Sequence, residues 1–216
     1  QLRGMDYAAL KTLWNCNDSI ASLHFQRMKT MDLQQGLTPA ILSYEGIQYQ
    51  YMAPKLFSNE EWEYVNRHLR ILSGFYGILK PDDRVTPYRL EMQTKLPAGG
   101  KKDLYEFWGR KLYDALEDSV IINLASREYS RAVEPYLTPD DRFVTCVFGE
   151  YKEGKVKVKA TEAKMARGEM VRYMAQNRIR EPEEIRDFDR LGYRYWEELS
   201  LKDAFIFIKE TKSTQK

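Results

Sequence analysis

The sequence predicts an α+β fold: a single mixed α/β domain over residues 1–216, with a mixed sheet flanked by helices. Segments with the apolar period of helices and short segments typical of strands both occur, without the regular βαβ alternation of a doubly wound sheet. The chain has 216 residues, enough to bury a core without disulfides or a structural metal. Aromatic residues make up 13% of it, which argues against intrinsic disorder.

The expected elements follow from periodicity, capping residues and turn residues. The predicted helices are 5–14, 19–31 (opened by Ser19), 58–73, 103–116, a short one from Ser126 ending by Pro135, 161–179, and a short acidic one from Pro182. The predicted strands are 40–44, 120–125, a hairpin over 142–160 turning at Glu153-Gly154, and 204–209. Residues 81–100 are expected to form loops, because they contain three prolines and a Gly-Gly pair.

The helix over 58–73 has the clearest signals. Ser58 and Glu61 have the spacing of a capping box, and an apolar stripe follows them. Gly74 supplies a stop. Asp103 and Glu106 form a similar pair at the start of the helix over 103–116, so capping explains both carboxylates.

Cysteine usage and hydropathy indicate the cellular setting that we expect for this protein. Cys16 and Cys146 lie far apart and outside any C-x-x-C motif, so we expect two reduced thiols in a cytoplasmic protein. No run of 18 apolar residues occurs, so no membrane span is expected. No signal peptide is visible, and the sequence begins at Gln1 rather than Met. We expect a monomer.

Charge is segregated along the chain although the total is only +2. Residues 150–180 contain nine basic and four acidic side chains, whereas 181–198 contain three basic and seven acidic ones. Lys155, Lys157 and Lys159 alternate with small apolar residues, which places three ammonium groups on one face of a strand. They either protect a sheet edge or form a row of phosphate contacts.

The helix that follows carries a second basic group. On a helical wheel Lys164, Arg167, Gly168 and Arg172 fall within about 140° of arc. A glycine inside a helix costs about 1 kcal/mol relative to alanine, so something should offset it. Gly168 allows close approach either of a nucleic-acid backbone or of another element of the protein.

Two glycines flank a tight turn in the segment from Leu72 to Leu79. This arrangement loosely resembles the hairpin of helix-hairpin-helix DNA-binding proteins, in which backbone N–H groups face a phosphate. The match is imperfect, because two residues lie between the glycines and Pro81 leaves little room for an immediate second helix. A glycine C-cap followed by a turn explains the segment equally well.

Candidates for catalysis are few. The sequence contains no nucleophile elbow, phosphate-binding loop, H-E-x-x-H motif or dinucleotide fingerprint. No cluster of ligand residues suggests a metal site or a cofactor. Asn123 and Ser126, at the end of a predicted strand, are the best remaining polar pair. Tyr88 and Arg89, side by side after a proline, suit phosphate contact with base stacking, or else Arg89 pairs with Glu91 or another buried carboxylate.

Five motifs, in order along the chain, resemble the signature of the bacterial YaaA peroxide-stress protein family. They are His68-Leu69-Arg70-Ile71-Leu72-Ser73-Gly74-Phe75-Tyr76-Gly77-Ile78-Leu79-Lys80-Pro81, Pro87-Tyr88-Arg89-Leu90-Glu91-Met92, Asp103-Leu104-Tyr105-Glu106-Phe107-Trp108-Gly109, Ile122-Asn123-Leu124-Ala125-Ser126-Arg127-Glu128-Tyr129 and Lys164-Met165-Ala166-Arg167-Gly168. The similarity spans essentially the whole chain. Two departures are Gln93, where the family has Gly, and the absence of an N-terminal strand with an Ile-Ser-Pro-Ala-Lys-Thr motif.

The resemblance implies a cytoplasmic bacterial protein of the hydrogen peroxide response, associated with limiting free intracellular iron. It also implies a mixed α/β domain with a helix-hairpin-helix-like element and a basic cleft that binds DNA. The DNA-binding residues expected from this resemblance and from the charge pattern are Ser73, Gly74, Tyr76, Gly77, Arg89, Lys157, Lys159, Lys164, Arg167, Gly168 and Arg172.

Three functions are weighed at this point. The first is a DNA-binding stress protein that contacts phosphates with little sequence preference, since no recognition helix is evident. The second is an enzyme acting on a nucleotide or nucleic-acid intermediate through Tyr88, Arg89, Asn123 and Ser126. The third, direct iron sequestration, has the least support because the sequence contains only two histidines and two cysteines.

Overall fold

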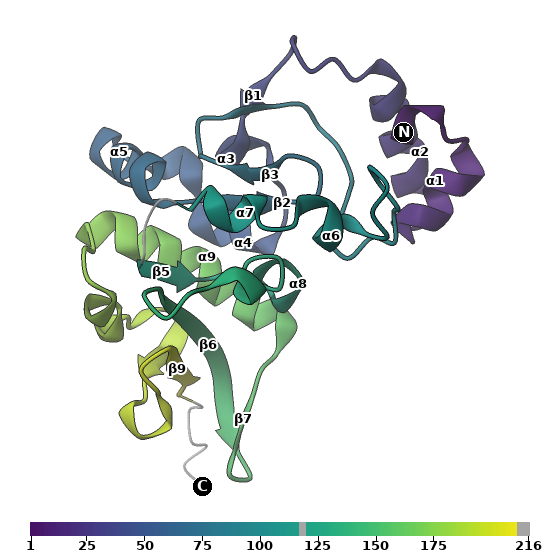
Figure 1. Cartoon of the computed structure of the whole chain (residues 1–216). Helices are drawn as coiled ribbons and strands as arrows, with labels where there is room; N and C mark the ends of the chain where they lie inside the picture. The colour runs from purple at the N-terminus through teal and green to yellow at the C-terminus, as the bar shows by residue number, and fades with distance from the viewer. Residues whose placement is uncertain (117–119, 211–216) are drawn as a thin grey trace, which may run out of the picture. The chain divides into compact units, whose positions relative to one another are not determined.

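The computed structural model describes residues 1–116 and 120–210 (Figure 1). These residues form helices and a mixed parallel and antiparallel sheet, which confirms the predicted α+β class. The described residues divide into two compact units, the first made of 1–43, 69–116 and 125–137 and the second of 44–68, 120–124 and 138–210. Because each unit combines three separate segments, neither is a contiguous sequence domain, and one domain over 1–216 stays a prediction.

The second unit is built on a five-stranded sheet. Four of its strands follow the order β5-β6-β9-β8, and the fifth, β7, pairs with residues 150–152 at the end of β6. The strands β5 and β9 run parallel to β6, whereas β7 runs antiparallel to β6 and β8 antiparallel to β9. Their bounds are β5 Val120–Asn123, β6 Arg142–Lys152, β7 Lys155–Lys157, β8 Tyr193–Tyr195 and β9 Ala204–Lys209.

The longest helix of this unit is α9, which packs against β6. The core beneath it is aromatic, with the Phe148 ring 5.1 Å from Phe207 and 5.9 Å from Phe188. Cys146 and Met170 are buried in the same cluster. The helical elements of the unit are α4 Ile47–Met52, η2 Pro54–Leu56, α5 Asn59–His68, α9 Ala160–Asn177, η4 Pro182–Asp187, η5 Arg190–Gly192 and η6 Glu197–Leu199.

The first unit is mainly helical, with two small two-stranded sheets. In these sheets β1 pairs with β4, and β2 pairs with β3. Its elements are η1 Leu2–Gly4, α1 Tyr7–Trp14, α2 Asp18–Thr30, β1 Thr38–Pro39, α3 Ala40–Ser43, β2 Ile71–Ser73, β3 Gly77–Leu79, β4 Arg84–Val85, α6 Leu104–Trp108, α7 Lys111–Asp114, α8 Arg127–Ser130 and η3 Glu134–Tyr136.

Two predicted caps are confirmed and one is displaced. The Ser58 hydroxyl accepts from the Glu61 N–H at 3.2 Å, and the Glu61 carboxylate accepts from the Ser58 N–H at 2.7 Å. The Asp103 carboxylate accepts from the Glu106 N–H at the start of α6. The cap of α2, however, is Asn17 rather than Ser19.

Three predicted elements are wrong in type or length. Residues 40–43 form a helix instead of a strand, and the strand pairing in this region is confined to Thr38–Pro39, which pairs with β4. The helix expected over 58–73 ends at His68, since Ile71–Ser73 pairs with Gly77–Leu79. The helix expected over 103–116 breaks at Gly109, which has a φ of +51°.

The turn between β2 and β3 is the segment that resembles a helix-hairpin-helix element. The structure shows a two-stranded antiparallel hairpin with Ser73 opposite Gly77. The next element along the chain is the strand β4, and the next helix is α6. The likeness is therefore limited to the turn itself.

Candidate nucleic-acid interface

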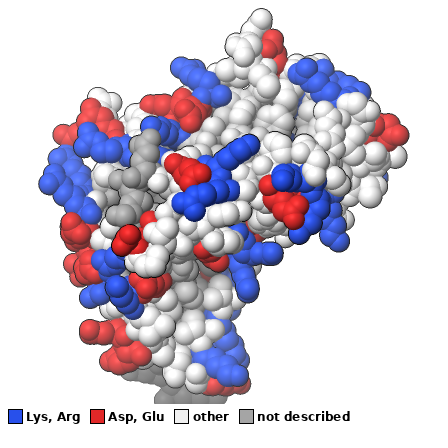
Figure 2. Space-filling view, in the orientation of Figure 1, with Lys and Arg blue, Asp and Glu red and all other residues white. Residues whose placement is uncertain are grey.

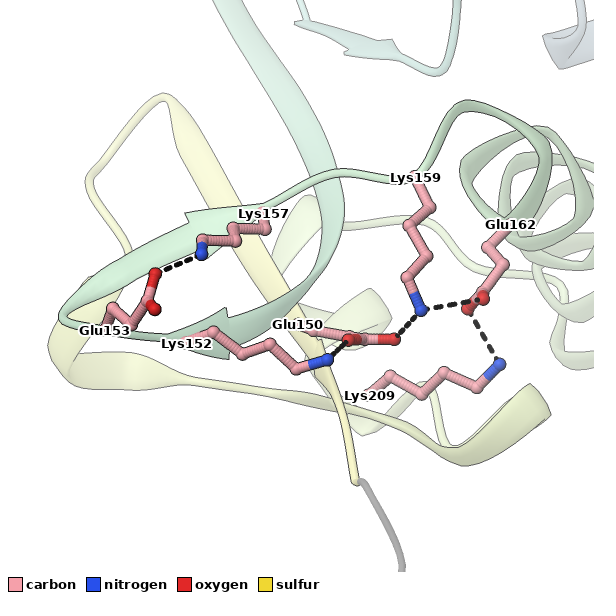
Figure 3. A network of polar contacts seen from close by, with 7 residues as sticks. All are labelled: Glu150, Lys152, Glu153, Lys157, Lys159, Glu162 and Lys209. Atoms are coloured by element: carbon pink, nitrogen blue, oxygen red, sulfur yellow. Dashed lines mark hydrogen bonds and ion pairs between the residues drawn. The ribbon is translucent and has the colours of Figure 1, made fainter.

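The lysines of the β6–β7 hairpin form ion pairs. Lys157 pairs with Glu153, and Lys159 pairs with both Glu150 and Glu162 (Figure 3). Only Lys157 of these two lies within β7, because Lys159 precedes α9 as its N-cap residue. The predicted row of lysines along one strand face therefore ends at Lys157, and Lys159 lies outside the strand.

Glu150 lies at the centre of this network. Its side chain is 8% exposed and contacts both Lys152 and Lys159. Hydrogen bonds from Lys152 and then Lys159 lower the pKa of Glu150 to about 2. On β9, Lys209 Nζ lies 2.8 Å from a Glu162 carboxylate oxygen, and this hydrogen bond lowers the pKa of Glu162.

Lys157 and Lys159 thus have carboxylate partners in the folded chain, and their contact with phosphates stays a prediction. Lys152 and Lys159 share Glu150, and Lys159 and Lys209 share Glu162, so the network holds four ammonium groups against three carboxylates. Figure 2 shows similar mixing on one face of the molecule, where acidic side chains interrupt the basic ones. The hairpin lysines are better explained by protection of the sheet edge and by internal pairing.

Sequence reasoning missed Glu150 as a partner, although a signal was present. A hairpin turning at Glu153-Gly154 places Lys152 opposite Lys155 and Glu150 opposite Lys157, which is the observed register. Residues opposite each other across antiparallel strands interact. Extending the predicted turn by two pairs would have placed a carboxylate beside the lysine row.

Gly168 is explained by packing between helices. A Cβ atom at this position would lie 2.0 Å from the Gln48 carbonyl oxygen and 2.9 Å from the Met52 backbone nitrogen. The helix α4 therefore covers Gly168, which is buried. This corrects its assignment as a DNA-contact residue, because the backbone of α4 occupies the space where a phosphate would have approached.

The position of α4 also divides the predicted basic face of α9. Arg167 and Arg172 lie about 140° apart around the helix, with Gly168 and its α4 contact between them. Lys164 and Arg167, by contrast, are three residues apart and project from neighbouring positions. We refer to Lys164 and Arg167 as the α9 cation pair.

The α9 cation pair differs from the hairpin lysines in its lack of acidic partners. Within residues 1–116 and 120–210, no carboxylate forms an ion pair with Lys164 or Arg167. Lys164 is exposed, whereas Arg167 is half-buried and its Nε is fully buried without a hydrogen-bond acceptor. Burial lowers the pKa of Arg167, since desolvation disfavours its charge.

Arg167 lies near Cys146, whose thiol is buried in the aromatic core. Burial raises the pKa of Cys146 to about 12. The thiol is therefore protonated at neutral pH and offers Arg167 no countercharge. Protein interiors normally pair a charge that they bury, so Arg167 stands out among the described cations.

The turn residues of the β2–β3 hairpin serve the packing of their own unit. Ser73 is fully buried, and its hydroxyl accepts from the N–H groups of Phe75 and Tyr76 at 3.2 and 2.8 Å. Ser73 also shares a 2.6 Å hydrogen bond with the Tyr88 hydroxyl. The amides expected to face a phosphate are thus already satisfied, and this corrects the assignment of Ser73.

The two glycines of this turn are buried as well. A Cβ on Gly74 would lie 2.6 Å from the Leu90 carbonyl oxygen, and one on Gly77 would lie 2.7 Å from the Trp108 ring. The Trp108 indole N–H donates to the Gly74 carbonyl at 3.0 Å. Neither glycine is open to a phosphate. Tyr76 is half-buried, and its hydroxyl accepts from the Thr86 N–H at 3.0 Å.

Three of the four polar residues of the enzyme hypothesis, Tyr88, Arg89 and Asn123, have local side-chain contacts. Tyr88 bonds to Ser73, and Arg89 lies 3.1 Å from Glu91. The Asn123 amide donates to the Thr145 hydroxyl at 3.2 Å, and Ser126 precedes α8 as its N-cap residue without a side-chain cap bond. Tyr88 and Asn123 thus support the backbone and sheet of their own units.

A metal-ligand cluster and a membrane-spanning helix are both absent from the described residues. No group of three or more His, Cys, Asp or Glu side chains is placed to hold a metal ion there, so the iron-sequestration hypothesis gains no ligand set. No helix in that part of the chain has the length and apolar character needed to cross a membrane.

Comparison with known proteins places the chain in a family. The family described as "Peroxide stress protein YaaA" matches residues 1–199. A UPF0246 protein of Lachnoclostridium phytofermentans is 56% identical over 210 residues, which cover 96% of this chain and 82% of that protein. A UPF0246 protein of Pediococcus pentosaceus is 51% identical, with 96% of this chain and 84% of that protein covered. On these matches and the fold described above, the chain belongs to the peroxide stress protein YaaA family.

Proposed function

We propose that this protein binds DNA in the cytoplasm during the bacterial hydrogen peroxide response, and that the α9 cation pair, Lys164 and Arg167, contacts phosphate groups. The observation that carries the proposal is Arg167, a half-buried guanidinium without a carboxylate partner in the described residues. Membership of a peroxide stress family supplies the physiological setting.

The energetic argument starts from the cost of burying a charge. A partly desolvated guanidinium is unfavourable unless an anion compensates it. A phosphate supplies two acceptor oxygens in a geometry that matches the planar fork of arginine. Lys164, one helical turn away and exposed, adds a second positive charge for a neighbouring phosphate.

Contacts of this kind predict little sequence preference. Lysine and arginine bound to phosphates position a protein on DNA without reading the bases. Affinity should then fall steeply as salt rises, because each contact releases counterions. A link to lower free iron would be indirect, through protection or regulation of DNA.

The test compares two double variants of the full chain by fluorescence anisotropy with labelled duplex DNA. Lys164→Gln plus Arg167→Gln removes the unpaired cations. Lys157→Gln plus Arg178→Gln removes one lysine and one arginine whose charges pair with Glu153 and Glu60. Both variants lose the same total charge.

A charge-assisted hydrogen bond is worth about 1.5–3 kcal/mol, so losing two should weaken binding about 100-fold or more. The charge-matched control should lose less than about 5-fold, because exposed ion pairs contribute little. Equal losses in the two variants would show that only net charge matters. Unchanged affinity in the Lys164 and Arg167 variant, with a native melting curve, would refute the proposal.

A further inference from the structure

A separate hollow of about 290 Å³ lies in the second unit. Its wall is formed by α4, α9 and η5 of the second unit. The lining residues are Gln50, Tyr51, Glu169, Arg172 and Leu191. We call it the Arg172 hollow.

The charge of this hollow is set by Arg172. Glu169 also lines it, but its carboxylate lies 3.4 Å from the Arg190 guanidinium, which compensates its charge. Arg190 is held by two more contacts: it donates to the Gln176 amide oxygen at 2.6 Å and lies over the Tyr173 ring at 5.4 Å. Arg172 is therefore the uncompensated charge in the lining.

Three side chains of the hollow keep their donors unused. Gln50, Tyr51 and Arg172 form no side-chain hydrogen bond or ion pair with any residue in 1–116 or 120–210. Arg172 and Tyr51 are half-buried, so their polar groups are partly withdrawn from water. A guanidinium, a hydroxyl and an amide that converge from two helices present donors from several directions.

The opposite rim is apolar and conformationally unusual. Leu191 has a φ of +56° and a ψ of +20°, and the residue is 37% exposed. A leucine in the left-handed region is strained and persists only where its surroundings fix it. The anchored Arg190 on one side and the buried Tyr193 on the other fix this loop.

We propose that the Arg172 hollow binds a single phosphoryl group, with Arg172, Tyr51 and Gln50 as its donors. A tetrahedral oxyanion has acceptor oxygens on several sides, which suits donors from two helices better than a planar carboxylate would. The site is distinct from the α9 cation pair, because neither Lys164 nor Arg167 lines the hollow. It therefore does not depend on the function proposed above.

The phosphoryl group has two sources. The first is a small free compound, either inorganic phosphate or a phosphate monoester, and the second is the backbone of bound DNA. Isothermal titration of the full chain with inorganic phosphate tests the site itself, at constant ionic strength and with acetate as the planar anion. Arg172→Gln should weaken phosphate binding at least about tenfold, and Tyr51→Phe about threefold. Arg180→Gln, which removes an exposed arginine outside the hollow, should leave it unchanged.

Equal phosphate affinity in wild type and folded Arg172→Gln would overturn the proposal, as would equal affinity for acetate and phosphate. Chemical shifts of the Arg172 Nε–Hε group on phosphate addition give a second readout that does not depend on stability. Competition by duplex DNA that survives Lys164→Gln plus Arg167→Gln would identify DNA as the source. Phosphate binding without such competition would identify a free phosphate compound.

Discussion

The replacement of Gly168 by alanine separates packing from ligand contact most sharply. By helix propensity alone, alanine should stabilise α9 by about 1 kcal/mol. The structure predicts the opposite, because the added Cβ would lie 2.0 Å from the Gln48 carbonyl oxygen and 2.9 Å from the Met52 nitrogen. Both neighbours are backbone atoms of α4, so no side-chain rotation relieves the contact.

The expected size follows from these contacts. Relief requires α4 and α9 to separate by about 1 Å, and overpacking of this kind costs about 3 kcal/mol at the upper end of its usual range. Subtracting the propensity gain leaves a loss of about 2 kcal/mol. For a chain of this size, that corresponds to a fall in Tm of about 4–8 °C.

Urea unfolding monitored by circular dichroism measures the effect. Gly4→Ala is the matched control, since Gly4 lies in the short helix η1 and no atom lies within 4 Å of the Cβ it would gain. It should leave stability within about 0.5 kcal/mol of wild type. A Gly168→Ala protein as stable as wild type would refute the packing explanation, and a selective loss of DNA binding would restore the phosphate reading.

Two further predictions concern buried polar groups. Glu150 has a pKa lowered to about 2, so the stability it contributes is present above its unfolded pKa of about 4.3 and is lost as the pH falls towards 2. In urea unfolding, the difference in stability between wild type and Glu150→Gln should therefore be largest near pH 7 and shrink below pH 4. A difference that stays constant with pH would contradict the ion-pair network. Ser73→Ala leaves the Phe75 and Tyr76 amides without their acceptor, so it should lower the free energy of unfolding by about 2 kcal/mol while DNA affinity stays unchanged. A variant as stable as wild type but with weakened DNA binding would indicate that the turn contacts DNA.

The elements with strong local signals were predictable from the sequence. The capping box of Ser58 and Glu61, the Asp103 cap, the strand β9 and the turn at Glu153-Gly154 all occur as expected. The caps and the turn depend on contacts between residues close in sequence, whereas β9 is marked by a continuous apolar run of strand length. Local patterns therefore suffice where the partner lies within a few residues.

The errors arose where distant contacts decide the structure. The apolar run up to Ser73 fits a helix, but pairing with Gly77–Leu79 makes its end a strand. The strand β8 has only three residues, too few for a periodic pattern, and it is defined by its antiparallel pairing with β9. Tertiary pairing overrode a local pattern in the first case and supplied the structure in the second.

The candidate site shows the same division between features that depend on nearby residues and features that depend on distant ones. The charge pattern correctly directed attention to α9, but it could not distinguish Lys164 and Arg167, which lack acidic partners, from Lys157 and Lys159, which have them. Nor could a helical wheel show that α4 covers Gly168. Charge along a sequence counts cations, whereas binding depends on which of them remain uncompensated after folding.

The salt dependence of DNA binding tests the central claim most directly. Anisotropy titrations of duplex DNA across a salt series should give a linear log–log plot for the wild-type chain, with a slope of several units. Each phosphate contact contributes about 0.9 to this slope, so Lys164→Gln plus Arg167→Gln should reduce its magnitude by about 1.8. Identical slopes for the two proteins, or no binding by the wild type at low salt, would contradict the account.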